Sequence, residues 1–276
     1  MNNAALDHAA ALIAQADALI VAAGAGMGVD SGLPDFRGNE GFWRAYPALG
    51  RAGLDFMSAA SPRTFERDPR LAWGFYGHRL ALYRRTVPHA GFGLLQQWGA
   101  RTPRGLAVFT SNVDGQFQRA GFSDTPLHEC HGSLHWLQCL RSCGQAPWPA
   151  DGLTPDIDDT ECRWLGDLPT CPGCGSLARP NVLMFGDADW AGDRYQAQAW
   201  RLSDWLGRVD RAVVLEIGAG TAVPSVRHFS QLVVAAHGGR IVRINLRESD
   251  VAPAFGVGLA SGALHALTAL QERLTA

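Results

Sequence analysis

The chain lacks three features that would assign it to a class at once: a strong net charge, a long apolar run and a dense set of cysteines. Its 24 Lys and Arg residues nearly balance its 26 Asp and Glu residues, which leaves a formal net charge of −2 at pH 7. A surface for nucleic acid or anionic lipid normally carries a large excess of positive charge. No nucleic-acid partner is therefore evident, and local basic pairs such as Arg84 and Arg85 are interpreted as solvated surface.

No uninterrupted apolar segment approaches the length of a membrane span. The first residues form an alanine-rich stretch that contains Asp7 and His8 and has no basic start, which predicts a helix and not a signal peptide. Six cysteines in 276 residues are too few for a disulfide scaffold. We therefore expect a cytoplasmic protein without a membrane partner.

Five short, continuous apolar runs predict strands that are buried on both faces of a parallel sheet. They span residues 19–23, 105–109, 182–185, 213–217 and 241–244. Helical patterns lie between them, for example at 4–16, 89–98, 191–205 and 225–237. This alternation predicts a doubly wound, Rossmann-like α/β fold.

Two stretches interrupt the alternation. Residues 39–88 are rich in aromatic residues and helix formers, and they predict a helical insert. Residues 134–177 hold two cysteine pairs among turn-forming Gly, Pro and Asp, and they predict a small metal-binding insert. The chain is thus expected to form a single catalytic domain over 1–276, with its Rossmann-like lobe built from 1–38, 89–133 and 178–276.

The first predicted strand opens into a glycine-rich loop, Gly24-Ala25-Gly26-Met27-Gly28, which continues to Pro34-Asp35-Phe36-Arg37. Glycines let the backbone approach a phosphate closely and turn amide hydrogens toward it. The G-x-G-x-G spacing is weak evidence by itself, because it departs from the usual dinucleotide pattern. Polar motifs also follow the other predicted strands, and ligands of such sheets bind beyond the carboxyl ends of the strands. The site is predicted at that edge.

Three further side chains could take part in chemistry there. Asn112 and Asp114 follow the second predicted strand, where they could form a simple turn or recognise a carboxamide. His131 lies between this edge and the cysteine-rich insert, where a cleft between lobes is expected. A neutral imidazole can act as a general base near neutral pH, although a single histidine more often only packs or faces solvent.

The cysteines of the insert form the pairs Cys139-x-x-x-Cys143 and Cys171-x-x-Cys174. Such knuckles place thiolates for tetrahedral zinc, and a closed four-thiolate site leaves no coordination position for a substrate. A structural zinc is therefore predicted, against the alternative of four unligated small apolar side chains. Cys130 is interpreted as a packing residue and not as a nucleophile.

The order of these motifs resembles the sirtuins, which are NAD-dependent protein-lysine deacylases. The shared pattern runs from Gly-Ala-Gly and Pro-Asp-Phe-Arg-Gly through Thr-x-Asn-x-Asp-Gly and His-Gly-Ser to the cysteine pairs, Arg-Pro-x-Val-x-x-Phe-Gly and a late Asn-Leu. The resemblance extends over residues 19–246. Five motifs in the same order are hard to obtain by chance.

The resemblance implies NAD as cofactor, an acylated-lysine protein or peptide as substrate, and nicotinamide, free lysine and O-acyl-ADP-ribose as products. His131 would be the base on the ribose hydroxyls, and Asn112 and Asp114 would hold nicotinamide and its ribose. Val182, Met184 and Phe185 would line the acyl-lysine tunnel. The other NAD contacts would be Gly24, Ala25, Gly26, Asp35, Phe36, Arg37, Ser111, Gly218, Gly220, Thr221, Asn245 and Leu246.

The segment Phe75-Tyr76-Gly77-His78-Arg79 is similar to the Phe-Tyr-x-x-Arg of sirtuins that prefer succinyl and related acidic acyl groups. Tyr76 and Arg79 would share one helix face, so a phenol and a guanidinium could reach one carboxylate. The alternative is a packing Tyr and a surface Arg.

The chain also departs from the family pattern. Gly28 stands where Ser is usual, Ser111 where Gln is usual, and Phe117 where His is common. The loop at Gly218 is one residue shorter than the family's Gly-Thr-Ser version. A deacetylase or desuccinylase is the first expectation; an NAD glycohydrolase or ADP-ribosyltransferase and a non-catalytic NAD or ADP-ribose sensor remain alternatives, and the oligomeric state is left open.

Overall fold

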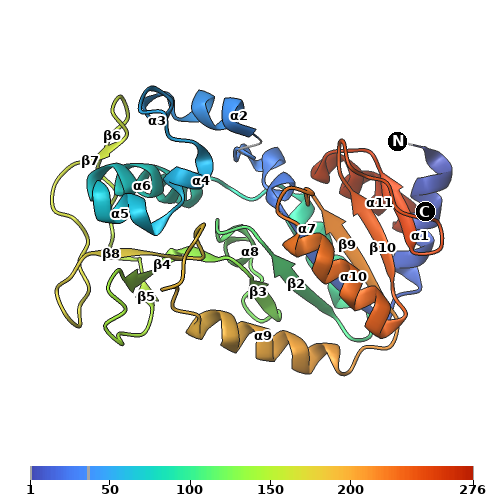
Figure 1. Ribbon diagram of the computed structural model, residues 1–276. Coiled ribbons are helices and arrows are strands. Elements are labelled where there is room, and N and C mark those ends of the chain that lie inside the picture. The colour runs from blue at the N-terminus through green and yellow to red at the C-terminus, as the bar shows by residue number, and fades with distance from the viewer. Residues whose placement is uncertain (1, 36–37, 276) are drawn as a thin grey trace.

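The computed structural model describes residues 2–35 and 38–275, and its larger lobe is built on a six-stranded parallel sheet (Figure 1). The strand order is β11-β10-β9-β1-β2-β3. The order reverses at β1, which lies between β2 and β9, so the loops after these three strands meet at a topological switch point. The strands are β1 (Ala18–Ala23), β2 (Leu106–Thr110), β3 (Leu127–Glu129), β9 (Ala212–Ile217), β10 (Arg240–Ile244) and β11 (Gly256–Leu259).

Helices cover both faces of this sheet, which confirms the doubly wound α/β fold (Figure 1). Alternate side chains of a strand point to opposite faces. In β1, Leu19 and Val21 accordingly join one apolar cluster, and Ile20 and Ala22 join the other. The first cluster contains α1 (Asn3–Ala14), α7 (Gly91–Arg101) and α11 (Ala263–Thr275), and the second contains α9 (Asp193–Leu206) and α10 (Ser225–His237).

The predicted strands at 19–23, 105–109, 213–217 and 241–244 are confirmed to within about a residue at each end. The prediction that 182–185 forms a strand of this sheet is wrong. The strand there is β8 (Ala178–Val182), which pairs antiparallel with β4 (Gly132–Cys139) in a separate three-stranded sheet. Its Arg-Pro-Asn sequence does not look like a buried strand, yet Arg179 is fully buried because Asp187 pairs with it.

The smaller lobe combines the helical and the cysteine-rich segments (Figure 1). Trp73 and Tyr76 of one segment share an apolar cluster with Leu134 and Trp164 of the other. A Cβ at Gly74 would lie 1.9 Å from the carbonyl oxygen of Cys162, so glycine lets the two segments touch backbone to backbone. The helices are α2 (Gly38–Ala45), α3 (Pro47–Arg51), α4 (Phe56–Ala59), α5 (Pro62–Arg67) and α6 (Pro69–Arg85); the short strands are β5 (Trp148–Pro149), β6 (Ile157–Asp158) and β7 (Arg163–Trp164).

Three short helices belong to the loops that follow β1 and β2. They are η1 (Ala25–Met27), η2 (Val29–Ser31) and α8 (Gln116–Arg119). Within residues 2–35 and 38–275, no helix combines the length and the apolarity that crossing a membrane requires.

Candidate functional site

The loops after β1 and β9 pack backbone against backbone. The Gly26 amide donates to the Gly218 carbonyl at 3.1 Å. A Cβ on Gly26 would lie 2.6 Å from the Cα of Gly218, and a Cβ on Gly24 would lie 2.8 Å from the Cα of Ala219. Gly218 itself has φ +65°, in the left-handed region. The glycines are therefore required by the packing of the two loops, in addition to any contact with a phosphate.

A cavity of about 80 Å³ opens where these loops meet the loop after β10. It brings together five of the predicted NAD contacts: Gly26, Asp35, Gly218, Asn245 and Leu246. Gly24 and Ala25 adjoin it in sequence, and Ser111 follows β2. Gly220 and Thr221 lie in the neighbouring loop but do not line this cavity. Phe36 and Arg37 fall outside the described residues.

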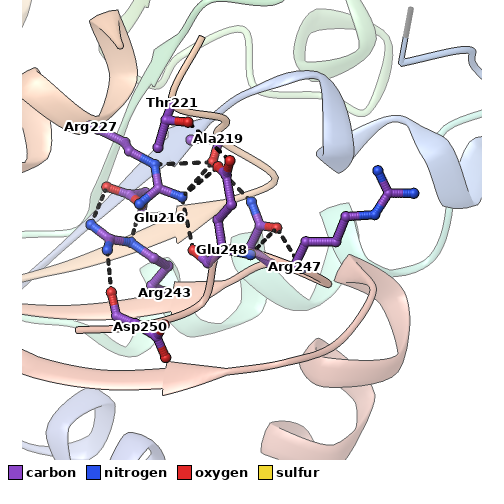
Figure 2. Close-up of polar contacts among 9 residues, drawn as sticks. Glu216, Ala219, Thr221, Arg227, Arg243, Arg247, Glu248 and Asp250 are labelled. Atoms are coloured by element: carbon purple, nitrogen blue, oxygen red, sulfur yellow. Dashed lines mark hydrogen bonds and ion pairs between the residues drawn. The ribbon is translucent and has the colours of Figure 1, made fainter. Parts of the chain in front are cut away.

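A charged network beside the cavity was missed by sequence reasoning (Figure 2). Arg243 of β10 and Glu216 of β9 are neighbours across the two strands and form a buried ion pair. The Arg243 guanidinium also donates to the carbonyl of Asp250. Because the guanidinium joins both strands to the segment after β10, the pair holds that segment against the sheet.

The same network fixes the loop after β9. Arg227 of α10 donates to the Ala219 carbonyl at 3.0 Å and to the Glu248 carboxylate at 3.1 Å. Asn245 donates to the same carbonyl at 2.9 Å, and Thr221 donates to Glu248 at 2.9 Å. Figure 2 shows both loops tied to α10 through these groups. The loop after β9 is thus held by side chains of α10 and of the segment after β10.

The loop after β2 carries the two predicted nicotinamide contacts. The Asn112 side-chain amide donates to the Gly24 carbonyl at 3.0 Å, which places it against the glycine-rich loop. Asp114 is 8% exposed and accepts a hydrogen bond from the amide of Gln116 at 2.9 Å. Burial raises the pKa of Asp114 to about 6; the charge of Glu129 acts in the same direction and that of Arg79 opposes it.

His131 lies where the two lobes join. It precedes β4, and its carbonyl accepts a hydrogen bond from the Leu183 amide at 3.0 Å. Gly132 has φ +75°, and a Cβ there would lie 2.1 Å from the Asn181 carbonyl, so only glycine can follow His131 in this register. Burial lowers the pKa of His131, while a hydrogen bond to the Ser111 backbone opposes that shift. Burial therefore favours the neutral form of the imidazole.

The segment after β8 holds the three predicted tunnel residues. Val182 and Met184 are buried and Phe185 is half-buried, all within the apolar cluster of the smaller lobe. The Arg179 guanidinium donates to both Asp187 carboxylate oxygens at 2.7 and 2.8 Å, and the Met184 amide donates to Asp187 at 3.3 Å. The buried Arg179–Asp187 ion pair therefore holds the segment 179–187 in a fixed turn.

Tyr76 and Arg79 of α6 lie in the interior of the smaller lobe, at 1% and 8% exposure. The Arg79 guanidinium donates to the Tyr83 hydroxyl through Nε at 3.0 Å and Nη2 at 2.7 Å, and it lies 5.2 Å from the centre of the Phe75 ring. The alternative of a surface arginine is therefore wrong. Tyr83 was not singled out from the sequence, although its position one helical turn beyond Arg79 was an available signal.

The four predicted zinc ligands come together. All Sγ atoms of Cys139, Cys143, Cys171 and Cys174 lie within 4.8 Å of one another, and two of the pairs are at 3.6 Å. A tetrahedral site with Zn–S bonds near 2.3 Å has S–S edges of about 3.8 Å. The cysteines are therefore positioned to hold a structural zinc. Cys130 is buried outside this group, and burial raises the pKa of its thiol to about 12, which suits a packing role.

Comparison with known proteins agrees with this geometry. The model of the Sir2 family matches residues 24–214. An NAD-dependent protein deacylase of Thermococcus kodakarensis is 32% identical over 253 residues, which cover 90% of this chain and 87% of that protein. One of Methylococcus capsulatus is 32% identical over 270 residues, covering 97% and 96%. The solved complex of a Sir2 homologue with NAD has a TM-score of 0.73 at 26% identity, and the match covers 100% of this chain and 94% of that one.

Proposed function

The chain belongs to the Sir2 family, and we propose that it is an NAD-dependent protein-lysine deacylase with His131 as its general base. The observation that carries this proposal is the position of His131. The Ser111 backbone, in the loop after β2, opposes the lowering of the imidazole pKa by burial, and the His131 carbonyl accepts from Leu183 in the segment that holds the tunnel residues. His131 thus lies between the loop that carries the predicted nicotinamide contacts and the segment that carries the predicted tunnel residues.

The roles of the chain's residues follow from their positions. Bound NAD supplies an ADP-ribosyl group, with nicotinamide as the group that leaves. The loops after β1, β9 and β10 would hold the nucleotide, and Asn112 and Asp114 would orient the nicotinamide ribose. His131 would accept the proton of a ribose hydroxyl on a ring nitrogen, which makes that oxygen nucleophilic toward the acyl carbon.

Product identification tests the proposal. Incubation with NAD and an acyl-lysine peptide is expected to yield free lysine peptide, nicotinamide and O-acyl-ADP-ribose in equal amounts by mass spectrometry. Free ADP-ribose with unchanged peptide would instead indicate an NAD glycohydrolase, and ADP-ribosylated peptide would indicate an ADP-ribosyltransferase.

We further propose that Tyr76 and Arg79 select an acidic acyl group such as succinyl. Arg79→Met should lower kcat/KM for a succinylated peptide by about 10- to 150-fold, the effect of losing a hydrogen bond to a charged group. Deacetylation should be spared or raised, because acetyl offers Arg79 no carboxylate. Arg85→Met, at the exposed end of the same helix, is the matched control. Equal losses on both peptides, or a wild-type preference for acetyl, would contradict this selection.

Asp114→Asn should lower the activity and raise the stability of the protein at pH 7.5. The folded-state pKa near 6 lies above the ordinary value of 3.8, so stability falls as pH rises through about 6 and Asp114 ionises in its buried position. Asparagine cannot ionise but can still accept from Gln116. The variant should therefore be more stable than wild type at pH 7.5, by up to about 3 kcal/mol, with lower activity.

Denaturant unfolding should show this difference in stability shrinking as pH falls from 6 to 4. Asp124→Asn, at an exposed position, is the control. A loss of stability in Asp114→Asn that is equal at pH 7.5 and pH 4 would contradict the expectation.

A further inference from the structure

We infer that Ser225, to which no motif pointed, is a positioning residue whose hydroxyl holds the imidazole of His131 in the orientation and tautomer that a general base needs. This inference rests on the proposed function. Ser225 is the first residue of α10, and its Oγ lies 3.2 Å from His131 Nε2. The contact joins the residue before β4, in the smaller lobe, to the start of α10, in the Rossmann-like lobe.

Both sides of this contact are fixed by other bonds. The His131 carbonyl accepts from the Leu183 amide at 3.0 Å, and Gly132 packs against the Asn181 carbonyl with no room for a Cβ. On the other side, the amide of His228 donates to the Pro224 carbonyl at 2.8 Å and starts the helix, and Val226 is 1% exposed in the core. The hydroxyl is therefore presented to the ring by a rigid element.

The two partners of the ring determine where its proton lies. The Ser111 backbone contact raises the pKa of His131, which is the effect of a carbonyl that accepts from a ring N–H. Nε2 faces Ser225, so we assign that proton to Nδ1. Nε2 then carries the lone pair, and the Ser225 hydroxyl donates to it. The ring is thereby held in the tautomer whose Nε2 is unprotonated. When Nε2 takes the proton of a ribose hydroxyl, the Ser225 hydroxyl stops donating to it and can accept from the new Nε2–H.

A step-specific assay separates positioning from general packing. Exchange of isotope-labelled nicotinamide into NAD, in the presence of acyl peptide, reports the breaking of the nicotinamide bond, which precedes the base step. Multiple-turnover deacylation includes the base step. Ser225→Ala should lower deacylation kcat by about 3- to 10-fold, the effect of losing one neutral hydrogen bond. Exchange and the KM for NAD should stay at wild-type values.

Two variants serve as controls. Ser225→Thr keeps the hydroxyl and should deacylate within about two-fold of wild type. Ser203→Ala, at an exposed position on α9, should change neither assay. A Ser225→Ala enzyme that deacylates at the wild-type rate or faster would overturn the inference. So would equal losses of exchange and deacylation, or a Ser225→Thr variant as slow as Ser225→Ala.

The experiment also distinguishes this inference from the proposed function. A wild-type protein that neither exchanges nicotinamide nor deacylates either peptide, acetylated or succinylated, would refute the proposed function. An active wild type with an unaffected Ser225→Ala variant would refute only the role of Ser225.

Discussion

Replacing His131 with alanine is expected to lower kcat/KM for deacylation by about 100- to 10,000-fold, the usual cost of removing a general base. The His131 ring is hydrogen-bonded to the Ser225 hydroxyl at 3.2 Å, and in the described part of the chain no other histidine side chain makes a hydrogen bond to that hydroxyl. Nicotinamide exchange should persist, because breaking the nicotinamide bond does not need the base. Steady-state deacylation and isotope exchange on the same protein preparation provide the measurement.

The matched control for this prediction is His228→Ala, an exposed histidine near the start of α10. Its kinetics should equal those of wild type, and both variants should keep the wild-type Tm. Deacylation close to wild type in His131→Ala would show that another group is the base.

Removal of zinc is the second change for which we expect a large effect. Zinc binding contributes apparent free energies of about 10–16 kcal/mol in small zinc domains, and this energy is also folding energy. Cys174→Ala, or chelation, should therefore unfold the segment between β4 and β8 and lower the Tm. Activity should be lost as well, because these paired strands carry Cys139 at one end and both His131 and the tunnel residues at the other.

Elemental analysis gives the direct test of the metal. Wild type and Cys162→Ala, which alters a cysteine outside the quartet, should each contain one zinc per chain. Cys174→Ala should contain less. Freshly purified, active wild-type protein without zinc would contradict the site.

The parallel sheet could be predicted where its strands are mostly apolar. The strands β1 and β2 met this condition, and so did β9 and β10, which each carry one buried charged residue, Glu216 and Arg243, that pairs with the other. Strand β3 did not, because its Glu129 looks like a surface residue. Its carboxylate is buried because Arg194 and Gln198 donate to it at 3.0 and 3.1 Å. Strand β11 contains Gly256, where a Cβ would lie 1.9 Å from the Ile241 carbonyl. The local sequence pattern shows neither that a buried carboxylate is paired nor that two backbones approach closely at a glycine.

The candidate site could be located from the sequence because its glycine and polar motifs follow successive strands. The contacts that hold it in place could not. Ser225, Arg227 and Arg243 are ordinary residues in a helix or strand, and their roles arise from partners that are distant in the chain. The burial of Arg79 was likewise invisible, because a guanidinium enters a core only when aromatic and hydroxyl groups of other positions surround it.

Nicotinamide release by the wild-type protein, measured with NAD alone and with NAD plus acylated peptide, tests most directly whether this chain is a protein-lysine deacylase. Release should be fast with succinylated peptide and close to background without peptide or with the unacylated peptide, because in the proposed reaction the acyl oxygen would displace nicotinamide. Release at the same rate with and without acyl peptide would mean that the site hydrolyses NAD and that deacylation is not its function.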